Sequence, residues 1–119
     1  MREQAQTAAR ALAAGRMVVG VSLCVAPSVA APWAGDCARG SGARMIIRAL
    51  GVRDAALGVG TLASADEPVH LRRWLVLAAA CDAVDLAVTL TGPRSRARSI
   101  VLAMAAGATV AGAVAAASV

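Results

Sequence analysis

Residues 74–90 read WLVLAAACDAVDLAVTL, and this run indicates the fold class. Its 17 residues are apolar except for Asp82, Asp85 and Thr89. A helix that crosses a bilayer needs about 20 mostly apolar residues, so the run is close to the required length. It therefore predicts a transmembrane helix.

Three further apolar segments surround this run, at residues 11–31, 45–65 and 100–119. The stretches between the segments contain Pro, Gly and charged residues, which are typical of turns. Because these stretches are short, consecutive helices are expected to pack as antiparallel neighbours. We predict one all-α domain over residues 1–119, an integral membrane four-helix bundle with short loops that crosses the cell membrane several times.

The composition of the chain supports a bilayer as its surroundings. Hydrophobic residues make up 59% of the sequence, yet it has no Phe or Tyr and only two Trp. Too few polar residues are present to cover the surface of a soluble domain of this size. All twelve basic residues are Arg, giving a net charge of +5. They lie between or within apolar runs and lack stacking aromatics, which argues against nucleic-acid binding.

Two further features bear on location and on cofactors. The three cysteines show no CxxC spacing, so we expect no metal ion and no other cofactor. The first segment also fits a cleaved signal peptide, although its length favours a retained helix. The distribution of arginines leans only weakly toward both termini facing outward, so orientation stays open.

Ionisable residues interrupt the apolar segments. Each charged group near a bilayer centre costs about 3 kcal/mol on insertion scales, so such groups are expected to face the bundle interior and meet one another. The acids concerned are Asp54, Asp82 and Asp85, and the bases are Arg16, Arg48 and Arg53.

Helical spacing assigns most of these charges to two faces. At 100° per residue, Asp82, Asp85 and Thr89 form a single stripe on the third segment. On the second segment, Arg48, Gly51 and Asp54 fall within an arc of about 120°. The glycine there allows close approach of another helix or of a ligand.

Helical spacing does not determine which carboxylates the arginines contact. Arg53 points away from the arc, toward a different helix or another subunit. Arg48 and Arg16 lie near opposite surfaces, from which either can extend outward instead of reaching the aspartates. The candidate ligand-binding residues are Arg16, Arg48, Gly51 and Thr89.

Three carboxyl groups are candidates for acid–base chemistry. Two aspartates one turn apart in a low dielectric do not both ionise easily, unless an arginine compensates for the charge. Asp82 and Asp85, with Asp54 opposite, therefore form a candidate catalytic set. The alternative is structural, in which Arg/Asp pairs specify how Ala-rich helices assemble.

Two short motifs suggest a family. RALGVRD at residues 48–54 and CDAVD at residues 81–85 resemble small, mostly uncharacterised four-helix membrane proteins of actinobacteria that are loosely DoxX-like. The resemblance spans nearly the whole chain and implies the four-helix fold, but no activity. Two other four-helix families fit poorly. Vitamin K epoxide reductases require a CxxC pair, and small multidrug-resistance transporters carry a glutamate in the first helix, where this chain has Arg16.

Three functions are compatible with the sequence. The first is a membrane protein whose polar centre binds a small amphipathic ligand or a partner helix. The second is an intramembrane acid–base enzyme acting on a lipophilic substrate by epoxide opening, isomerisation or cyclisation. The third is a proton-coupled transporter, which at four helices requires a homo-oligomer to enclose a path.

Overall fold

The computed structural model describes residues 2–34, 39–91 and 96–119, and almost all of them are helical. The four long helices are α1 (Arg2–Val25), α3 (Ser41–Ala63), α4 (Pro68–Thr91) and α5 (Arg96–Ser118). A short 3₁₀ helix, η1 (Pro27–Ala30), and a single turn, α2 (Ala31–Ala34), connect α1 to α3. The described ranges contain no strand, which confirms the predicted all-α bundle of four helices.

Prolines explain where two helix boundaries differ from the predicted segments. The first segment was expected to continue to residue 31, but α1 ends at Val25. Ala26 precedes Pro27 and has φ −130° and ψ 74°, because a residue before proline is disfavoured in the helical conformation. Pro68 opens α4 six residues before the predicted start, since proline has no N–H to lose in a first helical turn.

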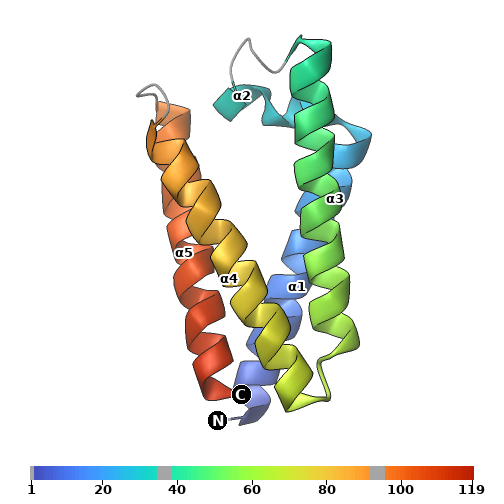
Figure 1. Cartoon of the computed structure of the whole chain (residues 1–119), viewed down its shortest axis with the longest axis vertical. Helices are drawn as coiled ribbons and strands as arrows, with labels where there is room; N and C mark the ends of the chain where they lie inside the picture. The colour runs from blue at the N-terminus through green and yellow to red at the C-terminus, as the bar shows by residue number, and fades with distance from the viewer. Residues whose placement is uncertain (1, 35–38, 92–95) are drawn as a thin grey trace.

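The four long helices form two antiparallel pairs (Figure 1). α1 packs along α3, and α4 packs along α5. The pairs converge at the end of the molecule that holds both termini and the α3–α4 turn, and they diverge toward the other end. A small core closes the convergent end, made of Ala9, Leu71, Leu75, Ala115 and Ala116.

Glycines allow α1 and α3 to lie in backbone contact. A methyl group on Gly51 would lie 2.6 Å from the carbonyl oxygen of Gly20, and one on Gly20 would lie 2.5 Å from the amide nitrogen of Ala55. Gly58 repeats the pattern two turns further along α3, against Ala13 and Met17 of α1. Close backbone approach through small residues is the usual way in which membrane helices associate.

Contacts between the two pairs are fewer and more varied. Trp74 of α4 lies flat against Gly60 of α3, so closely that a methyl group there would be 2.5 Å from the indole ring. The carbonyl oxygen of Ala65 in the α3–α4 turn accepts a hydrogen bond from Gln6. Arg10 forms a 2.8 Å ion pair with Asp66 in the same turn. These three contacts lie near the α3–α4 turn, at the convergent end of the bundle.

The outer surface carries many large apolar side chains. Exposed side chains include Val18, Val88 and Met104, whereas the buried ones are mostly alanine. Within the described ranges, three helices (Glu3–Val25, Pro68–Thr91 and Val101–Ser118) are long and apolar enough to cross a membrane. Every 18-residue stretch of α3 carries at least three charged residues, which sets α3 apart from the other long helices. Large exposed apolar surfaces of this kind fit lipid better than water.

The glycine contact leads to a stability prediction. We expect Gly51→Ala to destabilise the protein by about 1–3 kcal/mol, because the new methyl group overlaps backbone atoms of α1 that cannot move independently. Gly107→Ala is the matched control, since nothing lies within 4 Å of its added methyl group. The thermal unfolding midpoint of each variant in detergent, followed by circular dichroism, checks this. Equal midpoints for both variants would show that α1 and α3 are not in backbone contact.

Candidate functional site

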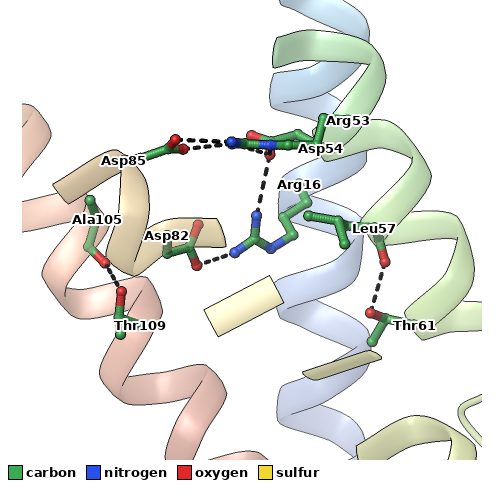
Figure 2. A network of polar contacts seen from close by, with 9 residues as sticks. All are labelled: Arg16, Arg53, Asp54, Leu57, Thr61, Asp82, Asp85, Ala105 and Thr109. Atoms are coloured by element: carbon green, nitrogen blue, oxygen red, sulfur yellow. Dashed lines mark hydrogen bonds and ion pairs between the residues drawn. The ribbon is translucent and has the colours of Figure 1, made fainter. Parts of the chain in front are cut away.

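An ion-pair cluster joins three of the helices, α1, α3 and α4. Arg16 of α1 donates from one terminal nitrogen to Asp82 of α4 and from the other to Asp54 of α3, the latter at 3.4 Å (Figure 2). Its side chain is 15% exposed, and those of Asp54 and Asp82 are 18% and 10% exposed. One guanidinium therefore ties together three helices from a largely buried position.

Arg53 of α3 extends the cluster to a third carboxylate. Its two terminal nitrogens donate to the two oxygens of Asp85 at 2.9 and 2.5 Å. The same guanidinium donates to Asp54 at 3.0 and 3.3 Å. A two-point contact between guanidinium and carboxylate is the strongest form of ion pair that side chains make. Asp54 thus accepts from both arginines and links the two halves of the cluster (Figure 2).

A cavity of about 790 Å³ lies beside this cluster. Its charged lining residues are Arg16, Asp54, Asp82 and Asp85. Most other lining residues are small and apolar, and they come chiefly from α1, α4 and α5, with Ala79, Ala108 and Gly112 among them. We call this cavity the interpair cleft.

The cleft has an apolar rim. Lining residues that are also exposed lie on α1, α2 and α5, including Val19, Pro32 and Met104. In a bilayer this rim would face lipid.

Four of the predicted site residues come together in the structure. Asp54, Asp82 and Asp85 share the cluster with Arg16, and all four line the cleft. The stripe predicted on α4 is present as far as Asp85. Thr89, one turn further, donates its hydroxyl to the carbonyl oxygen of Asp85 and does not line the cleft.

Two predicted ligand-binding residues lie elsewhere. Gly51 faces α1 and is buried against Gly20, so the close approach that it allows is that of a helix. Arg48 is exposed and forms no ion pair with any residue of the described ranges. The sequence allowed Arg48 either to reach the aspartates or to extend outward, and in the structure it extends outward.

Sequence reasoning placed Arg53 outside the site, yet it holds two of the three carboxylates. Residues i and i+1 do not share a helix face, so the spacing of Arg53 and Asp54 gave no reason to pair them. The length of the arginine side chain overcomes that separation, because its guanidinium reaches around α3 to meet α4. Residues 74–90 contain two aspartates and no arginine, and this excess of acids could have indicated that an arginine from another helix pairs with them.

Comparison of the chain with family models, curated proteins and solved structures found no match. The resemblance to small DoxX-like membrane proteins therefore stays a prediction, and the site itself carries the argument about function.

The cluster can recognise a polar group, while the rest of the cleft accepts an apolar one. Oδ1 of Asp82 and Oδ2 of Asp54 accept no hydrogen bond from any described residue. Both belong to residues that line the cleft. The arrangement therefore combines free acceptors at one wall with small apolar side chains along the others.

The two-point ion pair gives a second prediction. We expect Arg53→Gln to destabilise the protein by about 1–3 kcal/mol, because both oxygens of Asp85 lose their donors. Arg48→Gln removes the same charge from the same helix and should change stability by less than about 0.5 kcal/mol. Unfolding midpoints in detergent at neutral pH compare the two variants. Similar losses in both would mean that Arg53 contributes only its charge to the protein.

Proposed function

We propose that this chain is a multi-pass protein of the cell membrane that binds a small amphipathic molecule in the interpair cleft. The observation that carries the proposal is the cleft itself, whose volume of about 790 Å³ lies within the range of about 300–1,000 Å³ typical of small-molecule sites. Such sites are mostly apolar and contain a few convergent polar groups, as this one does.

The lining suggests how a ligand lies in the cleft. Its polar group would contact the carboxylates of Asp54 and Asp82, where acceptors are free. Its apolar part would lie along the small side chains of α5, such as Ala105 and Ala108. Small side chains leave room for a chain or ring between the helices, and the apolar rim provides entry from the bilayer.

A partner helix is the other occupant considered for a polar centre of this kind. A small molecule fits the observations better, because a spanning helix, about 10 Å across and about 30 Å long, is larger than a cleft of about 790 Å³. The acid–base enzyme and the proton-coupled transporter use the same carboxylates and stay hypotheses. Both require that a small molecule enters the cleft.

A photoreactive probe tests for entry. We expect a dodecyl alcohol that carries a diazirine in its chain to label the protein saturably in lipid nanodiscs, with labelled peptides from α1 and α5. Ala108→Phe should reduce the saturable labelling at least about tenfold, since the ring occupies the cleft. Mass spectrometry of the digested protein locates and quantifies the label.

The control lies five residues away on the same helix. Ala103 is exposed and does not line the cleft, so Ala103→Phe adds the same ring to an outer surface and should leave saturable labelling unchanged. Labelling that does not saturate, or that both variants reduce equally, contradicts a ligand site in the cleft. A wild-type dimer that blocks labelling would instead indicate a partner helix.

A further inference from the structure

The charged wall of the interpair cleft is acidic overall. Among the described residues, three carboxylates line it, from Asp54, Asp82 and Asp85, against one guanidinium, from Arg16. Arg53 does not line the cleft, but it neutralises part of this charge through its ion pairs with Asp54 and Asp85. Counting both arginines, two positive charges face three negative ones, so the fully ionised cluster carries a net charge of −1.

The one guanidinium that lines the cleft among the described residues is already paired with carboxylates. Both terminal nitrogens of Arg16 donate to carboxylates within the cluster. Thr61, the lining residue with a hydroxyl, donates to the carbonyl oxygen of Leu57 in its own helix. A carboxylate or phosphate ligand would have to share this guanidinium with two carboxylates and lie near a third, so charge repulsion disfavours it.

The acceptors of the wall, in contrast, are partly free. Asp82 is 7% exposed overall, and its Oδ2 is bonded to Arg16, whereas its Oδ1 accepts nothing from the described residues. Asp54 uses Oδ1 for both arginines, and its Oδ2 has no donor within the part of the chain that the structure describes. The two carboxylates share the Arg16 guanidinium through their other oxygens, so both free acceptors belong to the same cluster (Figure 2).

From these observations we infer that the interpair cleft selects lipophilic monocations, of the alkylammonium class, over neutral and anionic amphiphiles of the same size. The inference rests on the proposed function and adds the class of its ligand. An ammonium group donates to the free oxygens and cancels the unbalanced charge. Cancellation matters here because a charge in a low-dielectric site is costly unless it is paired.

Competition with matched probes tests this inference in nanodiscs that hold the full chain. Decylammonium, decanol and decanoate share one alkyl chain and differ in headgroup charge. Each competes with the photoreactive dodecyl alcohol at neutral pH. The concentration of each competitor within the bilayer is measured in protein-free nanodiscs. We expect decylammonium to halve the labelling at a bilayer concentration about tenfold below that of decanol, and decanoate to be the weakest competitor.

Single-charge variants separate the wall from the rest of the protein. Asp82→Asn removes the net negative charge, so the preference for decylammonium over decanol should fall about tenfold. Asp54→Asn makes the same change on the neighbouring helix and serves if Asp82→Asn fails to fold. Asp66→Asn is the control. Asp66 lies in the α3–α4 turn, where it pairs with Arg10 of α1, and it does not line the cleft.

The outcomes distinguish the two proposals. Equal or stronger competition by decanol or decanoate overturns the selection of cations and leaves the ligand site intact. A preference that survives in both Asp82→Asn and Asp54→Asn, or that falls as much in Asp66→Asn, also overturns it. Absence of saturable labelling by the alcohol, by contrast, contradicts the proposed function itself.

Discussion

The guanidinium of Arg16 is the interaction on which the arrangement of the helices depends. It comes from α1 and contacts carboxylates of both α3 and α4, so it links the α1–α3 pair to the α4–α5 pair. In an apolar environment neither the arginine nor the aspartates are stable alone, and mutual pairing is the least costly arrangement. The cluster therefore fixes the distance between the pairs at the level where their backbones separate.

The cleft follows from the same constraint combined with the composition of the chain. Glycines at the contact between α1 and α3 bring the two backbones together, so the smallest residues lie within this pair. Between the pairs, the sequence has no Phe or Tyr to fill the remaining space. Charged residues hold the pairs together at one level and alanines line the gap beside them, so a cavity is left where larger residues would have formed a core.

Much of the fold and four of the five residues of the ion-pair cluster could be predicted from the sequence. Length and hydropathy gave four helices, and helical spacing placed Asp82 and Asp85 on one face. The partners of each charge could not be predicted, because arginine side chains are long enough to reach carboxylates on several helices. Arg48 and Arg53 illustrate this. Arg48 was expected on the polar face of its helix but does not contact the cluster, whereas Arg53 was expected to point away from that face and does. Gly51 was ambiguous for another reason, as a glycine accepts a helix or a ligand equally well.

The stacking of Trp74 on Gly60 gives the protein an intrinsic optical reporter. The chain contains no tyrosine and only one other tryptophan, Trp33, so its near-ultraviolet emission comes from two indoles. Trp74 lies at the contact between α3 and α4, where any rotation of one helix pair against the other changes what surrounds the ring. In a protein without Trp33, the wavelength and lifetime of the remaining emission follow that rotation directly, with no attached dye.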